Sequence, residues 1–161
     1  MELTDKVKAV SRMQHYITEH LDEDITLEAL ADAAVYSKYH AVRVFREVTG
    51  QTPFETIRAL RLTKAAQTLQ ACDQKIVDVA MCNGFDSHDG FTRAFTRQFG
   101  ITPQKYHAET PPISWFVHYP IESYYILKEG TISMTNEKVS RTVTVTAIQR
   151  PARKLIFLRH N

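Results

Sequence analysis

The sequence repeats itself at an interval of about 50 residues within its first two-thirds. A shift of 50 positions aligns six identities in 17 positions, with Ser37, Arg43, Phe45, Gly50, Thr52 and Pro53 matching Ser87, Arg93, Phe95, Gly100, Thr102 and Pro103. A shift of 49 aligns apolar residues upstream of this block, so a one-residue difference falls between the two matched stretches. Because internal repeats indicate a structure assembled from similar units, we expect two related units in this part of the chain.

Each repeat is predicted to form two short helices separated by a tight turn. In the first repeat Thr26 and Ser37 can cap the two helices, and Gly50 suits the left-handed position after the second. In the second repeat Gly84 marks the turn and Ser87 can cap the helix that follows. Two helices joined in this way form the helix-turn-helix arrangement.

A longer helix is expected between the two units. The segment Thr52-Pro53-Phe54-Glu55 combines a capping box with proline at the first helical position. A helix of about 20 residues spans roughly 30 Å, close to the ~34 Å of one turn of B-DNA, which separates two successive major grooves. An amphipathic helix should also precede the first unit, with its apolar residues at Val7, Val10, Met13, Ile17 and Leu21. The predicted fold class is mainly α, with two tandem helix-turn-helix units, a long central helix and a short C-terminal β extension.

The second helix of each unit has an outward face that could meet DNA. In the first unit, helical spacing assigns Ala41, Val44, Phe45 and Val48 to the core and leaves Tyr39, Val42, Arg43 and Arg46 outside. In the second unit the core residues are Phe91, Ala94 and Phe95, and the outward ones are Asp89, Thr92, Arg93 and Thr96. His88 lies beside that outward face, at the helix start. Since arginine can donate two hydrogen bonds to guanine, Arg43 and Arg93 are the best candidates for base readout.

Three of these outward residues leave alternatives open. Tyr39 could lie against sugar and phosphate or complete the core. Val42 could widen the core stripe or contact a thymine methyl group, and Asp89 could accept from cytosine or hold Arg93. The backbone N–H groups at the two helix starts suit phosphates. The side chains assigned to phosphate contacts are Ser37, Lys38, Arg46 and Ser87.

Charge and composition constrain the function less than the repeat does. Residues 1–107 contain 13 Lys and Arg against 14 Asp and Glu, a net charge of −1, so overall basicity does not indicate a nucleic-acid binder. Cys72 and Cys82 are too few for a disulfide framework or a four-cysteine zinc site, and their apolar surroundings favour buried thiols. The histidines lack metal-ligand spacing and no catalytic motif occurs, so we expect no enzyme, no metal and no cofactor.

The first two-thirds of the sequence resembles a known family. Residues 26–107 look like the DNA-binding domain of AraC/XylS-type transcription regulators, above all at IVDVAMCNGFDSHDGFTRAFTRQFGITPQKY, which ends at Tyr106. In that family the outward residues of both recognition helices read bases. Carried over, these are Tyr39, Val42 and Arg43, then His88, Asp89, Thr92 and Arg93. Val42 and Asp89 occupy variable family positions, so the operator sequence does not transfer.

The remaining third of the chain has a different character. The prolines of Thr110-Pro111-Pro112 mark a linker, assigned to 109–140, after a DNA-binding domain at 1–108. Two strand-like segments follow at 141–161, and they resemble the opening of a GyrI-like effector-binding domain. We therefore expect a fragment of a longer regulator, or alternatively a tail that pairs with its copy in a dimer.

The sequence as a whole predicts a sequence-specific, DNA-binding transcription regulator that reads two adjacent major-groove segments. The alternatives are a DNA-targeting module of a repair or recombination enzyme and a protein-interaction module. The expected partner is double-stranded DNA, with RNA polymerase as a possible further partner and a small-molecule effector only in the full-length form. The absence of a signal-like start and of a long apolar run favours a cytoplasmic protein with no membrane partner.

Overall fold

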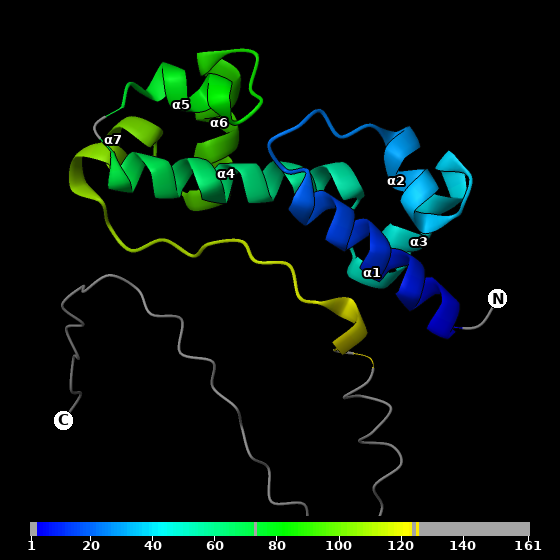
Figure 1. Cartoon of the computed structure of the whole chain (residues 1–161). Coiled ribbons are helices and arrows are strands. Elements are labelled where there is room, and N and C mark those ends of the chain that lie inside the picture. The colour runs from blue at the N-terminus through cyan, green and yellow to red at the C-terminus, as the bar shows by residue number, and fades with distance from the viewer. Residues whose placement is uncertain (1–2, 73, 124, 126–161) are drawn as a thin grey trace, which may run out of the picture.

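A computed structural model describes residues 3–72, 74–123 and 125 (Figure 1). In this part of the chain the structure is helical. In chain order the labelled helices are α1 (Leu3–Glu19), α2 (Leu27–Ala34), α3 (Lys38–Thr49), α4 (Pro53–Ala71), α5 (Ile76–Cys82), α6 (His88–Phe99) and α7 (Pro103–Glu109). The two predicted helix-turn-helix pairs are α2–α3 and α5–α6, and the predicted central helix is α4.

The two units have separate hydrophobic cores. The first core gathers α1, α2 and α3 with the start of α4, and its largest fully buried side chains are Met13, Ile17, Leu30 and Phe45. The second core gathers α5, α6 and α7 with the rest of α4, and it is rich in aromatic rings, notably Phe91, Phe95 and Tyr106. Each unit therefore buries apolar surface of its own, which is the main favourable contribution to its folding.

The central helix α4 belongs to both cores. Near its start Ile57 is buried in the first core, whereas Leu62, Ala65, Ala66 and Leu69 are buried in the second. The predicted capping box is present, since Thr52 Oγ1 accepts from the Glu55 backbone N–H and the Glu55 carboxylate accepts from the Thr52 N–H. With 19 residues, α4 is about 28 Å long. It holds the two units at opposite ends of one rigid element, as Figure 1 shows.

The turns of the two helix-turn-helix pairs have the same hydrogen-bonding pattern. At the end of α2, the N–H of Val35 donates to Asp32 O and that of Tyr36 donates to Ala31 O. At the end of α5, Gly84 N–H donates to Met81 O and Phe85 N–H to Ala80 O. Both turns are Schellman-type, with a left-handed residue at their centre: Val35 at φ 59° and Gly84 at φ 74°. The repeat seen in the sequence is thus a repeat of backbone conformation.

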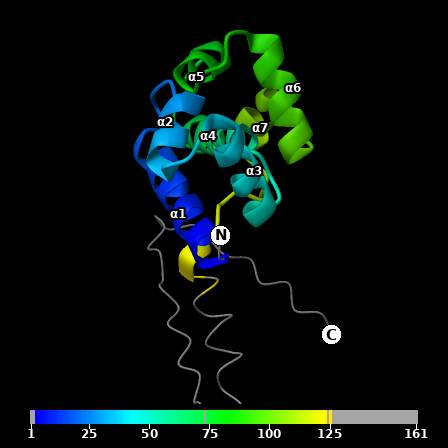
Figure 2. The ribbon, with the colours of Figure 1, turned by 90° about the vertical axis from the view of Figure 1, so that its right-hand side faces the viewer.

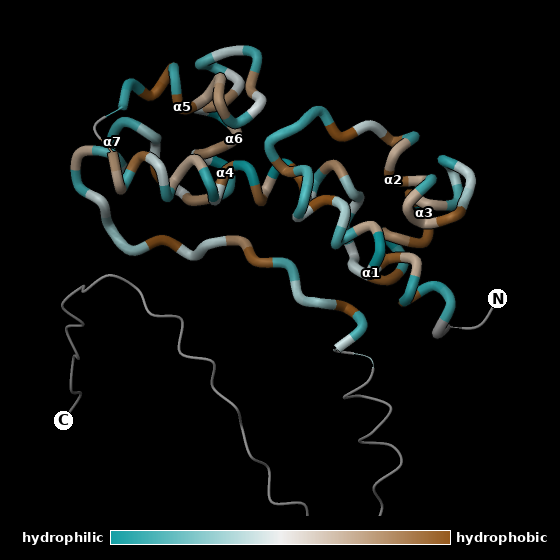
Figure 3. Tube along the Cα trace, in the orientation of Figure 1, coloured by the Kyte–Doolittle hydropathy of each residue, from teal (hydrophilic) through white to brown (hydrophobic). Residues whose placement is uncertain are grey.

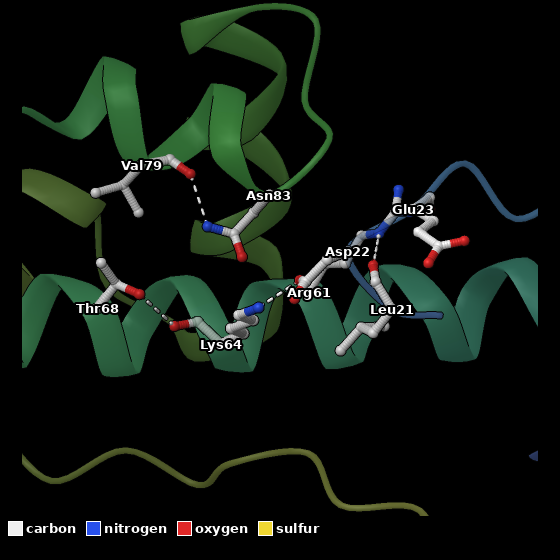
Figure 4. Close-up of polar contacts among 8 residues, drawn as sticks. All are labelled: Leu21, Asp22, Glu23, Arg61, Lys64, Thr68, Val79 and Asn83. Carbon is white, nitrogen blue, oxygen red and sulfur yellow. Dashed lines mark hydrogen bonds and ion pairs between the residues drawn. The ribbon is translucent and has the colours of Figure 1, made fainter. Parts of the chain in front are cut away.

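The loop between α1 and α2 is fastened to α4 by two basic side chains (Figure 4). Arg61 Nε donates to Leu21 O at 3.0 Å, and its terminal nitrogen donates to Glu23 O. Lys64 forms an ion pair with Asp22. Arg61 also lies under the second turn, because a Cβ added at Gly84 would meet Arg61 Nη1 at 2.6 Å. One arginine of α4 therefore contacts both units.

Residues 110–123, named here the C-terminal strap, run from α7 back beneath α4 to the first unit (Figure 1). Phe116 N–H donates to Thr63 Oγ1 on α4, and Ile121 N–H donates to the side-chain oxygen Oε1 of Gln14 on α1 at 3.2 Å. Ile121 is buried in the first core. The tube in Figure 3 has hydrophobic residues along this stretch. The described part of the predicted 109–140 linker is therefore packed against the helices that precede it.

The fold prediction is confirmed for the helical part. The cysteine prediction is wrong, because Cys72 and Cys82 are both exposed. Cys72 is the C-cap of α4 and Cys82 the last residue of α5, and both helices turn other residues toward the core. The β extension predicted at 141–161 lies outside the described residues, and the domain boundaries remain predictions.

Candidate nucleic-acid interface

The helices α3 and α6 lie on the same side of α4. Figure 2, which looks along α4, shows both of them to the right of it, while α1, α2 and α5 lie to the left. Each begins at the serine predicted to cap it: Ser37 Oγ accepts from His40 N–H at 3.4 Å, and Ser87 Oγ accepts from Gly90 N–H at 3.1 Å. Both caps expose serine side chains and the free N–H groups of a helix start, which favour anions.

The outward face of α3 is accessible. Arg43 and Arg46 are exposed, and Tyr39 retains 78% of its surface. Val42 is half-buried, between the two alternatives that the sequence left open. With Tyr39 and Arg43 it lines a shallow, mainly apolar hollow of about 610 Å³. A hollow of this composition can receive a methyl group or a sugar beside the arginine head group.

Charged neighbours surround this face. Lys38, predicted to contact phosphate, forms an ion pair with Glu28 at 2.8 Å, and both side chains are largely exposed. Such a pair is weakly held in water, so it can be exchanged for a phosphate. At the far end of α3, Glu47 accepts from Lys6, and this hydrogen bond, helped by the charges of Lys6, Arg43 and His40, lowers the pKa of the Glu47 carboxyl. Lys6 thereby offsets the negative charge of Glu47, which also acts on Arg43.

The outward face of α6 carries a different set of groups. His88, Asp89 and Arg93 are exposed and Thr92 is half-buried. Among the described residues, Asp89 approaches His88, with Oδ1 and Nδ1 3.6 Å apart, and not Arg93. The Thr96 hydroxyl is turned back to the Thr92 carbonyl at 2.7 Å. This face is therefore polar throughout, whereas that of α3 combines arginine with apolar groups.

An arginine-lined cleft lies between α4 and the second unit. It has a volume of about 530 Å³ and is lined by Arg58 and Arg61 from α4, by Arg93 and Arg97 from α6, and by Asp86 as the acidic member. Arg61 is engaged with backbone carbonyls. The sequence analysis did not assign Arg58 or Arg97 to the site. Their spacing from Arg61 and Arg93, three and four residues on a helix, was the signal that could have found them.

Two further features concern metal binding and membranes. In the part of the chain that the structure describes, no group of three or more His, Cys, Asp or Glu residues could hold a metal ion. No helix within those residues has the length and apolar character needed to cross a lipid bilayer.

Two capped helical hairpins that share α4, with their basic outward faces on one side, define a tandem helix-turn-helix protein. A family model described as a helix-turn-helix domain matches residues 30–109. The chain is also 38% identical over 99 residues to the regulatory protein SoxS of Escherichia coli (strain K12), a match covering 62% of this chain and 92% of that protein. The chain belongs to the AraC family of helix-turn-helix transcription regulators.

Two further relatives match a similar share of the chain. It is 39% identical over 102 residues to the right origin-binding protein of Escherichia coli (strain K12), covering 63% of this chain and 35% of that protein. The chain thus spans about a third of that relative. The DNA-binding domain of AdpA, solved in complex with a target DNA, superposes with a TM-score of 0.57 at 31% identity and covers 63% of this chain and 91% of that one. The family resemblance is confirmed; the GyrI-like resemblance of 141–161 lies outside the described residues.

Proposed function

We propose that the protein regulates transcription by inserting α3 and α6 into successive major grooves of one DNA duplex. The observation that carries this proposal is that both helices lie on the same side of α4, each with an arginine on its outward face. The length of the connector α4, about 28 Å, is close to the rise of one turn of B-DNA, about 34 Å, and supports this arrangement. A modest bend of the duplex would absorb the remaining difference.

The base-reading residues proposed on α3 are Tyr39, Val42 and Arg43. Arg43 can donate two hydrogen bonds to guanine O6 and N7, and Val42 can contact a neighbouring thymine methyl group from the apolar hollow. The ring of Tyr39 is exposed beside them and can pack on sugar or base. The first unit therefore favours a guanine next to a thymine.

The base-reading residues proposed on α6 are His88, Asp89, Thr92 and Arg93. Arg93 again suits guanine, and Asp89 suits the amino group of cytosine, because a carboxylate only accepts hydrogen bonds. The pairing of Asp89 with His88 supports this choice over a role in holding Arg93. The second unit would read its groove through hydrogen bonds alone.

The phosphates are assigned to groups at the edges of these helices. Ser37, Lys38, Arg46 and Ser87 stay in that role, and each is exposed. Arg58 and Arg97 join them, because they line the cleft that a DNA strand crosses between the two grooves. Contacts of this kind fix register and contribute affinity that depends on salt.

The proposal also covers the location of the protein in the cell and its further partners. As a family member the protein would work in the cytoplasm and contact RNA polymerase at a promoter, and a small-molecule effector would bind only a full-length form. The alternative, a DNA-targeting module of a repair or recombination enzyme, implies the same DNA contacts. A transcription assay in the host, with and without the gene, separates the two by promoter output.

The test is a titration of wild type and variants against duplexes selected from the host genome. Arg43→Ala and Arg93→Ala should each cost about 1–3 kcal/mol at one base position and relax the preference there. Arg58→Ala and Arg97→Ala should weaken binding to all sequences and reduce the salt slope by about one unit each. Lys8→Ala, exposed on α1 away from this surface, is the control. If both Arg43→Ala and Arg93→Ala bind every duplex as wild type does, the reading faces are misassigned.

A further inference from the structure

The head group of Arg43 is held by a neighbouring histidine. Arg43 Nη2 lies 3.2 Å from His40 Nδ1, one helical turn earlier on α3. A guanidinium only donates hydrogen bonds, so in this contact Nδ1 is the acceptor and the imidazole is neutral, with its proton on Nε2. The Tyr36 ring meets the imidazole edge to face, with centroids 4.5 Å apart and planes at 85°. The Tyr36 ring therefore holds the imidazole of His40 on one side, and the imidazole holds the Arg43 head group on the other.

The second unit lacks this arrangement. The 50-residue shift places Gly90 at the position of His40 and Arg93 at that of Arg43. A Cβ at Gly90 would lie 2.9 Å from the capping Ser87 Oγ, so even a small side chain is crowded there. The two units share a backbone plan, but only the first places an acceptor beside its arginine. The contact is thus not a requirement of the helix-turn-helix scaffold.

We infer that His40 is a positioning residue for base readout, which orients Arg43 when neutral and releases it when protonated. The inference rests on the proposed function, in which Arg43 reads a base. An arginine already held in place loses less side-chain freedom on binding than one that is free. Protonation of His40 turns Nδ1 into a donor and places a positive charge beside the guanidinium. Discrimination between sequences falls, while the added charge raises affinity for any DNA.

The charges that face His40 come from several elements. On α3 they are Arg43, which opposes a second positive charge, and Glu47, which favours it. From α2, Asp32 lines the same open hollow as His40 and Tyr36, so a protonated imidazole has an acidic group to turn toward. From α1, Lys6 engages Glu47 and weakens its pull. Protonated His40 can therefore pair with Asp32 or Glu47, and Arg43 then loses Nδ1 of His40 as its acceptor.

Two substitutions at His40 separate its role as a hydrogen-bond acceptor from its change of charge. His40→Phe keeps a ring against Tyr36 but removes the acceptor, and His40→Asn keeps an acceptor near the place of Nδ1 but does not titrate. His15→Ala is the matched control, since His15 is an exposed histidine on α1 outside the reading surface. The probes are a duplex enriched from a random library and the same duplex with the base pair read by Arg43 changed. Fluorescence anisotropy gives both affinities from pH 8 to pH 5.5, the range in which histidines change charge.

The ratio compared is the affinity for the enriched duplex divided by that for the changed duplex. In wild type and His15→Ala this ratio should fall about two- to tenfold as the pH drops, the scale set by immobilising one long side chain. His40→Phe should have the low ratio at every pH, and His40→Asn the high ratio at every pH. A wild-type ratio in His40→Phe, or a fall with pH that persists in both variants, overturns the inference. Circular dichroism checks that each variant is folded, and His40→Asn keeps the test valid if His40→Phe is not.

A measurement without DNA keeps the inference separate from the function on which it rests. Nitrogen-15 NMR of the free protein should show His40 with the proton on Nε2 at pH 8, and Arg43→Ala should shift the Nδ1 signal. A proton found on Nδ1 overturns the positioning role even if Arg43 reads a base. The expected tautomer together with wild-type discrimination in Arg43→Ala refutes the proposed function instead.

Discussion

Replacing Val35 by glycine should stabilise the protein. Val35 has φ 59° and ψ 44° at the end of α2, a left-handed conformation that a β-branched residue rarely adopts. The matching position in the second unit is Gly84, at φ 74° with the same pattern of hydrogen bonds. The turn thus accepts glycine without any change in backbone conformation.

The magnitude follows from three opposing contributions. The left-handed conformation costs a residue with a Cβ about 1–2 kcal/mol, and β-branching places valine near the upper end. Glycine loses more backbone freedom on folding, by about 0.5–1 kcal/mol. The valine side chain is 76% exposed, so its removal sacrifices about a quarter of the ~1.5–3 kcal/mol that full burial provides. The net gain for Val35→Gly is roughly 0.5–1 kcal/mol.

Urea unfolding measures this gain as a higher midpoint with an unchanged m-value. Val35→Ala, which keeps the Cβ, should gain less than Val35→Gly. The reciprocal change, Gly84→Ala, should destabilise by more than about 1 kcal/mol, because its Cβ would also press on Arg61 at 2.6 Å. A loss of stability in Val35→Gly, or an equal gain in Val35→Ala, would show that backbone strain at this turn is not the controlling factor.

Two further predictions concern contacts that hold the units together. Arg61→Met should destabilise by about 1–3 kcal/mol, because it removes two charge-assisted hydrogen bonds to loop carbonyls, one of them partly buried. In the same unfolding assay Lys64→Met, which removes an exposed ion pair, should cost less than about 1 kcal/mol. Burial in the strap lowers the pKa of His118 below that of the unfolded chain, so its stabilising contribution is complete above about pH 6.5 and is lost as the pH falls through the folded pKa. Wild type should therefore lose more stability than His118→Gln between pH 7.5 and pH 5, and equal losses would contradict this.

Local chemistry explains why much of the fold could be predicted from the sequence. The serine and threonine caps, the capping box and the glycines at left-handed positions act over four or five residues, so their signals survive in the sequence. The outward faces of α3 and α6 followed from helical spacing, since Arg43, Arg93 and Tyr39 are exposed as expected. Whether these residues contact bases remains a prediction.

What could not be predicted depends on contacts between distant residues. The strap reads as a proline-marked linker, but Ile121 meets Gln14 across 107 positions of sequence. The carbonyls that bind Arg61 are about 40 positions away. Cys72 and Cys82 have apolar sequence neighbours, yet they end their helices and face solvent, because the side of a helix and not its composition decides burial.

The return path of the strap decides where a following domain would pull. Although α7 ends the second unit, the chain after it travels the length of α4 and rejoins the first core at Ile121 and Tyr125. A segment that follows Tyr125 is therefore attached to the first unit, which contains α3, and not to the second unit, which contains α6. A force or movement transmitted through this attachment would act on the unit that contains α3 before the unit that contains α6. The first unit would then leave its DNA half-site while the second stays bound.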